Sequence, residues 1–191
     1  RPKFDFEPKS HVDLLPELGM ADFTRGAKVS GFRGYFLSGG AARLSFALWQ
    51  FAIDEMLAQG FTAMLVPSLV RPEAFLVTVY LPQGADDLYK TQDGDYLSGT
   101  AEVATMGYFM DETLTPESLP KNLVSFSPCF RREAGSHGKD TKGLIRVHEF
   151  YKVEQVVISQ ASHEESVKRH EELTKNAESF MQKLKLPYRV V

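Results

Sequence analysis

Charged and aromatic residues recur at regular spacing in one stretch of the chain, from Cys129 to Glu154. Arg131 and Glu133 come before a glycine-containing loop, and five residues follow it at two-residue spacing: Arg146, His148, Phe150, Lys152 and Glu154. Side chains two residues apart on a strand point to the same face. If two strands pair antiparallel across the loop, Arg131 and Glu133 will therefore lie near His148 and Arg146.

Such a surface would offer three kinds of group to a ligand. Guanidinium groups bind phosphate or carboxylate, an aromatic ring stacks on a base, and carboxylates accept hydrogen bonds from an amine. This combination suits a nucleotide bound beside an amino acid. Spacing alone leaves a second interpretation open, a solvated sheet face with cross-strand ion pairs worth about 0.2–1 kcal/mol each.

Two segments rich in Val, Ile and aromatic residues, 122–130 and 145–159, are typical of the strands that would carry these groups. Apolar residues of the second segment alternate with its charged residues, and we expect them to face the core: Ile145, Val147, Tyr151, Val153 and Val157. Shorter strands are expected at 34–37, 61–67 and 186–191, and residues 95–103 are expected to bring a short strand into a turn.

Two helices should frame these strands. The first starts at Ala41 and is closed by Gly60. Apolar residues lie around most of its circumference, so we expect it to be buried on more than one side, in a core or against a second subunit. The second covers 163–185, after a capping box formed by Ser162 and Glu165. This order of elements favours an α+β fold, an antiparallel β-sheet flanked by helices.

Composition narrows the class of protein. A chain of 191 residues with 43% hydrophobic residues can bury a core as one domain, and its net charge of −3 gives no case for bulk nucleic-acid binding. The single cysteine excludes an intrachain disulfide and favours a reducing compartment, which we take to be the cytoplasm, with the mitochondrial matrix left open. No apolar run reaches the ~18 residues that a membrane span needs, so no membrane partner is expected.

The stretch at 129–154 closely resembles motif 2 of class II aminoacyl-tRNA synthetases, in the version carried by seryl-tRNA synthetases. The family pattern is F-R-x-E, a loop, and then R-x-x-x-F-x-x-x-E. Six residues of this chain match it without a gap: Phe130, Arg131, Glu133, Arg146, Phe150 and Glu154.

The resemblance extends over most of the chain. Residues 1–40 look like a lead-in to the catalytic domain, 41–67 look like motif 1, and 96–103 look like the T-x-E segment with Thr100 and Glu102. It implies that residues 1–191 form a partial catalytic domain of the class II synthetase type. It also implies a homodimer formed through 41–67.

The resemblance assigns ATP to the motif 2 residues. Arg131 would be the catalytic residue that holds the ATP α-phosphate and the carboxylate of the amino acid. Glu133 would read the adenine amino group and Phe150 would stack on adenine. Arg146 would either brace the phosphates or only pair with Glu133.

The amino-acid site and the tRNA contact follow from the same resemblance. Thr100 and Glu154 would bind the polar atoms of L-serine beside Arg131, and Glu102 would contact serine directly or support the site. Three residues fall where the motif 2 loop of the family touches the tRNA acceptor end: Ser136, Lys139 and Lys142. A flexible polar turn is the alternative for these three. The implied reaction is activation of serine with ATP to seryl-adenylate, followed by transfer to tRNA(Ser), with Mg²⁺ held by ligands outside this chain.

Two departures from the family pattern matter. Val77 and Val79 occupy the positions of glycines in the loop before the T-x-E segment, so we expect a reshaped turn, with a displaced or disordered segment or a variant lid around 74–85. Motif 3 and the N-terminal coiled-coil arm are not found in the sequence. A non-catalytic scaffold protein and an amino acid:carrier-protein ligase therefore stay open as alternatives.

Overall fold

A central sheet with one long hairpin organises the computed structural model, which describes residues 3–136, 138 and 140–191. Its strands are β3 (Thr62–Leu65), β7 (Lys121–Phe130) and β8 (Glu149–Ile158), in the order β3-β7-β8. β7 and β8 pair antiparallel, with Ser125 opposite Glu154 and Cys129 opposite Phe150. β3 joins β7 in parallel. The predicted α+β class is confirmed, and this one parallel pair is an addition to it.

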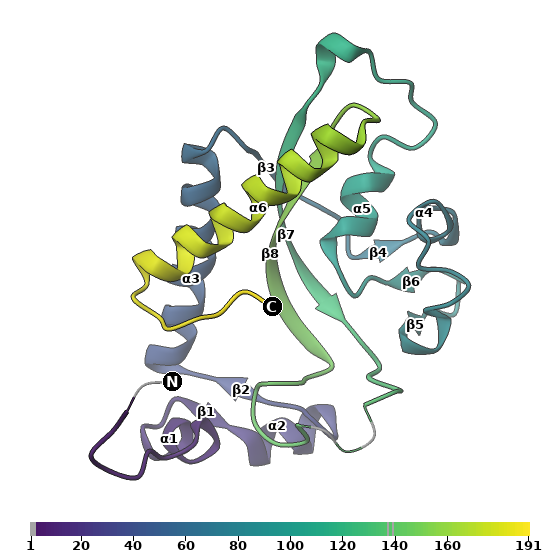
Figure 1. Cartoon of the computed structure of the whole chain (residues 1–191). Coiled ribbons are helices and arrows are strands. Elements are labelled where there is room, and N and C mark those ends of the chain that lie inside the picture. The colour runs from purple at the N-terminus through teal and green to yellow at the C-terminus, as the bar shows by residue number, and fades with distance from the viewer. Residues whose placement is uncertain (1–2, 137, 139) are drawn as a thin grey trace.

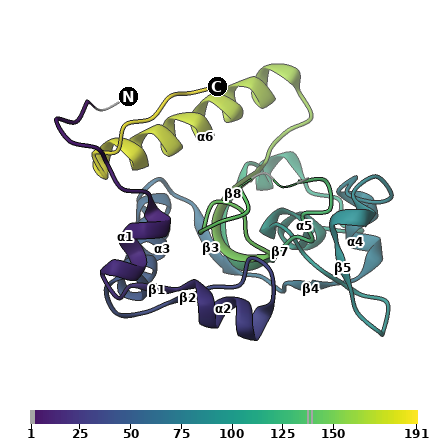
Figure 2. The same ribbon diagram turned by 90° about the horizontal axis from the view of Figure 1, so that it is seen from below.

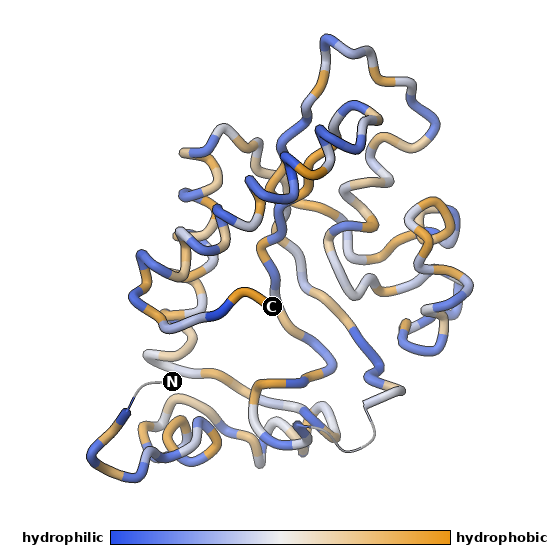
Figure 3. Tube along the Cα trace, viewed as in Figure 1, coloured by the Kyte–Doolittle hydropathy of each residue, from blue (hydrophilic) through white to orange (hydrophobic). Residues whose placement is uncertain are grey.

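Helices α3 (Gly39–Ala58) and α6 (His163–Lys183) lie on one side of the hairpin. Helices α4 (Pro72–Val77) and α5 (Ala101–Gly107) lie on the other (Figures 1 and 2). On the α3 and α6 side, a core forms from the following residues: Met56, Phe61, Val124, Val153, Val157 and Leu173. This side is the apolar face predicted for β8. Ser162 caps α6 by accepting a hydrogen bond from the backbone N–H of Glu165, as the capping box predicts. Figure 3 shows α6 as mostly hydrophilic, with apolar residues recurring along it.

The first predicted helix forms, but its burial differs from the prediction. Only Ala41 and Met56 of α3 are buried, and Leu44 and Phe46 are 60% and 64% exposed. The prediction that the core of this chain buries α3 on several sides is therefore wrong. Burial of α3 against a second subunit stays a prediction. One apolar side of α3 packs on the sheet and another faces outward.

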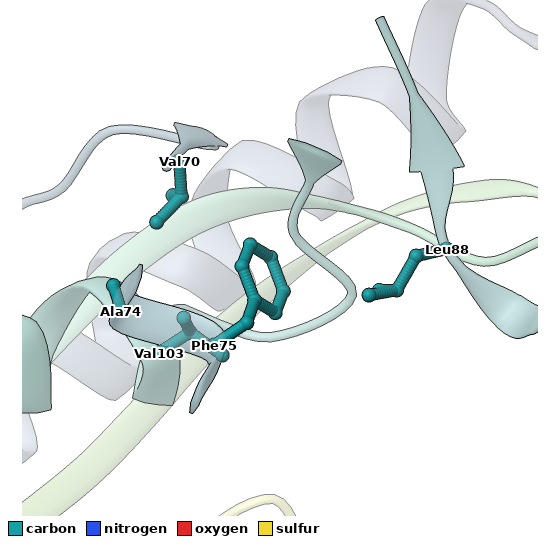
Figure 4. Packing of buried hydrophobic residues seen from close by; sticks show 5 residues of the cluster. All are labelled: Val70, Ala74, Phe75, Leu88 and Val103. Atoms are coloured by element: carbon teal, nitrogen blue, oxygen red, sulfur yellow. The ribbon is translucent and has the colours of Figure 1, made fainter. Parts of the chain in front are cut away.

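A second, smaller unit carries the T-x-E segment. It contains the antiparallel sheet β4 (Leu69–Val70), β6 (Tyr96–Leu97) and β5 (Tyr89–Lys90), with α4 (Pro72–Val77), a 3₁₀ turn (Ala85–Asp87) and α5 (Ala101–Gly107). Figure 4 shows the ring of Phe75, which is fully buried, between Val70 and Leu88. Helix α5 replaces the turn expected after the short strand at 96–97, because the side chain of Thr100 caps a new helix there.

The segment at 74–85 forms an ordered turn at the positions of the two valines. Helix α4 ends at Val77, and Val79 takes φ 62° in the left-handed region. The N–H of Val79 donates to Leu76 O, and the N–H of Tyr80 donates to Phe75 O. These two bonds define a Schellman motif, whose left-handed position is usually glycine. The disordered segment, one of the expectations, is therefore not found, and a displaced segment or a variant lid stays a prediction.

The N-terminal residues form α1 (His11–Glu17), β1 (Ala21–Asp22), α2 (Phe23–Ser30) and β2 (Phe36–Leu37), which lie at one end of the hairpin (Figure 1). β2 confirms the strand expected within 34–37. A further 3₁₀ turn, Pro116–Ser118, precedes β7. Within the described residues, no helix is both long enough and apolar enough to cross a membrane.

One predicted strand is shorter than expected, and another does not form. β8 begins at Glu149 and not at 145, and Ile145 is 69% exposed and not in the core. The segment 186–191 forms no strand. Strands need a neighbour to satisfy their backbone groups, and the described part of the chain offers these two segments no continuous ladder.

Candidate active site

Arg131 occupies the junction between the hairpin and the T-x-E segment. Its backbone N–H donates to His148 O at 2.9 Å, and its Nε donates to Gly99 O at 3.2 Å. The guanidinium carbon lies 5.2 Å from the centre of the Phe150 ring, a cation–π distance. The guanidinium is thereby fixed between the segment that carries Thr100 and the aromatic ring expected to face a base.

The strand model for Arg131 and Glu133 is wrong, although the proximity predicted from it is confirmed. β7 ends at Phe130, and Glu133 has φ 58°, so the two residues do not share a strand face. The chain leaves the strand because the N–H of Arg132 donates to Asp87 O instead of continuing the ladder. Arg131 still contacts His148, and Glu133 still pairs with Arg146.

Glu133 lies between two arginines. Its Oε2 atom is 2.6 Å from Arg146 Nη1 and 3.9 Å from Arg33 Nη1, and its side chain is only 10% exposed. The hydrogen bond to Glu133 raises the pKa of Arg146 above its usual range. A cavity of about 320 Å³ opens beside this pair, lined by Arg131, Glu133, Leu144, Ile145, Arg146, Val147 and Phe150.

A second polar cluster lies where α5 meets β8. Thr100 is 2% exposed, and its hydroxyl donates to Glu154 Oε2 at 2.7 Å. Lys152 Nζ donates to the same hydroxyl at 2.7 Å and lies 3.0 Å from Glu154 Oε2. The backbone N–H of Glu102 also donates to Glu154 Oε2, at 3.2 Å. Glu154 is therefore anchored by a hydroxyl, an ammonium and a backbone amide.

Tyr80 lies near this cluster. Burial raises the pKa of Tyr80, and the charges of Glu102 and Glu154 add to the effect while Arg131 opposes it. Burial also raises the pKa of the Cys129 thiol, which is fully buried behind the cluster, so Cys129 packs as a small hydrophobic residue. Arg131 lies beside both clusters, because it lines the cavity next to Glu133 and Arg146 and its Nε donates to Gly99 O, next to Thr100.

The remaining predicted residues lie at the edges of these clusters or outside them. Ser136 accepts a hydrogen bond from Arg33 Nη2 at 2.8 Å, and Lys142 is exposed in the loop. Lys139 lies outside the described residues. The side chain of Glu102 makes no hydrogen bond to the described residues, although its backbone N–H donates to Glu154.

Sequence reasoning assigned no role to Arg33 or Lys152, which the structure places in the two clusters. Lys152 carries a signal, because it shares its strand face with Phe150 and Glu154. Arg33 carries none, since it reaches Glu133 across 100 positions of sequence.

Comparisons with known proteins agree on one family. Residues 89–191 match the tRNA synthetase class II core domain (G, H, P, S and T). The chain is 48% identical over 190 residues to the serine–tRNA ligase of Fusobacterium nucleatum, covering 99% of this chain and 45% of that protein. It is 49% identical over 187 residues to the serine–tRNA ligase of a Nocardioides species, covering 97% of this chain and 44% of that one. The chain thus spans less than half the length of these relatives.

Two solved structures superpose on almost the whole chain. The cytoplasmic serine–tRNA ligase of Naegleria fowleri in complex with AMP gives a TM-score of 0.93 at 34% identity, covering 99% of this chain and 44% of that one. The seryl-tRNA synthetase of Pyrococcus horikoshii complexed with ATP gives 0.92 at 45% identity, covering 97% and 41%. Because more than half of the chain matches the family model, the chain belongs to the family of the tRNA synthetase class II core domain (G, H, P, S and T).

Proposed function

We propose that this chain carries the part of a serine–tRNA ligase that activates serine with ATP and then passes it to tRNA(Ser). The observation that carries the proposal is the position of Arg131 between the Phe150 cavity and the Thr100–Glu154 cluster. A nucleotide on Phe150 and an amino acid at Glu154 would meet at this guanidinium. The curated relatives and the AMP- and ATP-bound neighbours support the same assignment.

In the proposed reaction, a carboxylate oxygen of serine attacks the α-phosphorus of ATP. A new acyl–phosphate bond forms, the bond to the β-phosphate oxygen breaks, and pyrophosphate leaves with its electron pair. Negative charge increases on the phosphoryl oxygens, and the planar Arg131 guanidinium can stabilise it with directed N–H groups. Because its Nε is held by Gly99 O, this group is aligned before the substrates arrive.

Serine selection would come from the second cluster. The carboxylate of Glu154 would accept hydrogen bonds from the serine ammonium and hydroxyl groups, with the hydroxyl of Thr100 beside it. Because Thr100 is buried and donates to Glu154, its orientation is set by the protein. Alanine would leave the polar groups of the site unpaired, which discriminates more strongly than a missing methylene. The backbone contact of Glu102 supports the view that this residue braces the site.

The nucleotide side follows from Glu133 and its neighbours. Glu133 would accept a hydrogen bond from the adenine amino group, and Phe150 would stack on the ring. Of the two roles for Arg146, its 2.6 Å contact supports pairing with Glu133. Among the described residues, no group of three or more His, Cys, Asp or Glu side chains could hold a metal ion. The expected position of the Mg²⁺ ligands, outside this chain, stays a prediction.

Three further parts of the proposal concern the whole protein. We propose a homodimer through residues 41–67, supported by the outward-facing Leu44 and Phe46. We propose that Ser136, Lys139 and Lys142 contact the tRNA acceptor end, and that the protein acts in the cytoplasm. We also propose that residues 1–191 form a partial catalytic domain. In this proposal, motif 1 covers 41–67, the T-x-E segment covers 96–103 and motif 2 covers 129–154.

Serine-dependent ATP–pyrophosphate exchange tests the central proposal. The experiment compares the chain with Arg131→Ala and, as a matched control, with Arg132→Ala, whose side chain donates to Asp86 O outside the site. We expect exchange that requires serine, disappears in Arg131→Ala and persists in Arg132→Ala. A chimera in which the remaining residues of the Fusobacterium nucleatum relative follow Val191 is assayed in parallel. Absence of exchange in the folded chimera would favour the non-catalytic scaffold.

A further inference from the structure

Arg33 is a buried arginine to which the proposed reaction gives no role. Its side chain is 2% exposed, although it stands in the N-terminal segment, far in sequence from motif 2. Its Nη1 lies 3.9 Å from Glu133 Oε2, and its Nη2 donates to Ser136 Oγ at 2.8 Å. One guanidinium therefore contacts both the first part of motif 2 and the start of its loop.

The turn that carries Arg33 is held in place before any ligand binds. Arg33 has φ 66°, and its guanidinium lies 5.1 Å from the centre of the Phe32 ring. Gly26 of α2 crosses the backbone of Gly34 so closely that a Cβ on either residue would collide with the main chain of the other. The close crossing fixes the 31–35 turn against α2, and it thereby fixes the direction in which Arg33 leaves the backbone.

Glu133 receives both arginines on one oxygen. Arg146 and Arg33 both approach Oε2, and Oε1 makes no hydrogen bond to the part of the chain that the structure describes. Both guanidinium groups attract the same oxygen, Arg146 through a 2.6 Å hydrogen bond and Arg33 as an ion pair at 3.9 Å, and together they restrict rotation of the carboxylate. The second oxygen then points from a fixed carboxylate and can accept one hydrogen bond. Arg146 is 39% exposed, whereas Arg33 is almost completely buried, so Arg33 is the more rigid of the two supports.

We infer that Arg33 is a positioning residue for adenine recognition: it holds Glu133 so that Oε1 accepts a hydrogen bond from the adenine 6-amino group. The inference rests on the proposed function, which places adenine at Glu133. Inosine triphosphate has an oxygen at position 6 in place of the amino group. The preference for ATP over inosine triphosphate would then depend on Arg33, which does not touch the nucleotide. Binding of serine, at the other end of Arg131, should be independent of Arg33.

The test measures dissociation constants for ATP, inosine triphosphate and serine by calorimetry, in the chain and in the chimera described above. Arg33→Met removes the charge and keeps the volume, and Arg33→Lys keeps the charge without the planar fork. Arg25→Met is the matched control, because Arg25 lies in α2 of the same segment, is 79% exposed and pairs only with Asp22 among the described residues. Glu133→Gln and the double variant Arg33→Met/Glu133→Gln complete a cycle.

Loss of the largely buried ion-pair attraction at 3.9 Å should lower the ATP-to-inosine triphosphate preference about tenfold in Arg33→Met. Arg33→Lys should recover part of it, Arg25→Met should match the wild type, and serine affinity should not change. The double variant should be no worse than Glu133→Gln. An unchanged nucleotide preference in Arg33→Met, with only a lower melting temperature, would overturn the inference and leave Arg33 a purely structural residue.

Failure of the proposed function would look different. In that case the wild-type chimera would show no serine-dependent exchange and would bind neither triphosphate. A wild-type chimera that exchanges with serine but binds ATP and inosine triphosphate equally would keep the proposed function and remove the role of Arg33 through Glu133.

Discussion

Val79 offers a direct test of how this chain completes a turn without glycine. At 79, the left-handed φ of 62° costs a non-glycine residue about 1–2 kcal/mol. Val77, by contrast, is the last residue of helix α4. Val79→Gly should therefore release strain that Val77→Gly cannot. The two residues are 74% and 58% exposed, so neither substitution removes much buried surface.

The comparison of the two variants isolates the strain. Both replace valine by glycine, so the added freedom of the unfolded chain, roughly 0.4–1 kcal/mol for such changes, cancels in the difference. What remains is the strain at Val79, together with a small difference in burial. We expect Val79→Gly to be more stable than Val77→Gly by about 1.5 kcal/mol. For a chain of this size, this corresponds to roughly 3–6 °C in melting temperature.

Thermal unfolding followed by circular dichroism, with urea midpoints as a second measure, gives the result. Val79→Gly should melt at or above the wild type, and Val77→Gly should melt below it. Equal destabilisation by the two variants would refute the reasoning, because it would mean that the Val79 turn stores no strain. A Val79→Ala variant, which keeps a Cβ, should gain less than Val79→Gly.

Two further predictions concern the site and the proposed dimer. Lys152→Met should raise the KM for serine about tenfold and leave the KM for ATP unchanged, since it removes a charge-assisted contact to Glu154 at 3.0 Å. Steady-state kinetics measure both constants, and equal changes for the two substrates would contradict the prediction. Phe46→Glu should convert a dimer into a monomer in light scattering at tens of micromolar without lowering the melting temperature, because Phe46 is 64% exposed in the single chain. A wild-type chain that is monomeric under these conditions would count against the dimer.

Much of the hairpin could be predicted from the sequence because its signals are local. Alternation of apolar and charged residues along β8 reflects the two faces of a strand, and the apolar side does pack against α3 and α6. Pairing across the loop then brought Arg131 to His148 and Glu133 to Arg146, as predicted. The strand ends were less predictable. The backbone N–H of Arg132 donates to Asp87 O, in a turn that lies far away in sequence.

The exposed side of α3 shows a different limit. Apolar residues around a helix indicate that several sides avoid water, but they do not say which neighbour covers each side. In the described part of the chain, the sheet and α6 cover α3 in part, with Phe51 in contact with Phe180, whereas Leu44 and Phe46 are exposed. The same holds for Arg33: an arginine among glycines gives no sign of burial, and its contact with Glu133 exists only once the N-terminal segment folds against the hairpin.

The helix ends separate what the sequence by itself determined from what only the tertiary structure decided. Gly60 closes α3 at φ 83°, as a glycine after an apolar helix predicts, because glycine takes the left-handed region without steric cost. Val79 closes α4 with the same pair of backbone bonds, although valine opposes that conformation. Phe75, fully buried among Val70, Leu88 and Val103, holds α4 in place and with it the turn. Local preference thus set the end of α3, whereas packing of a buried core overrode local preference at the end of α4.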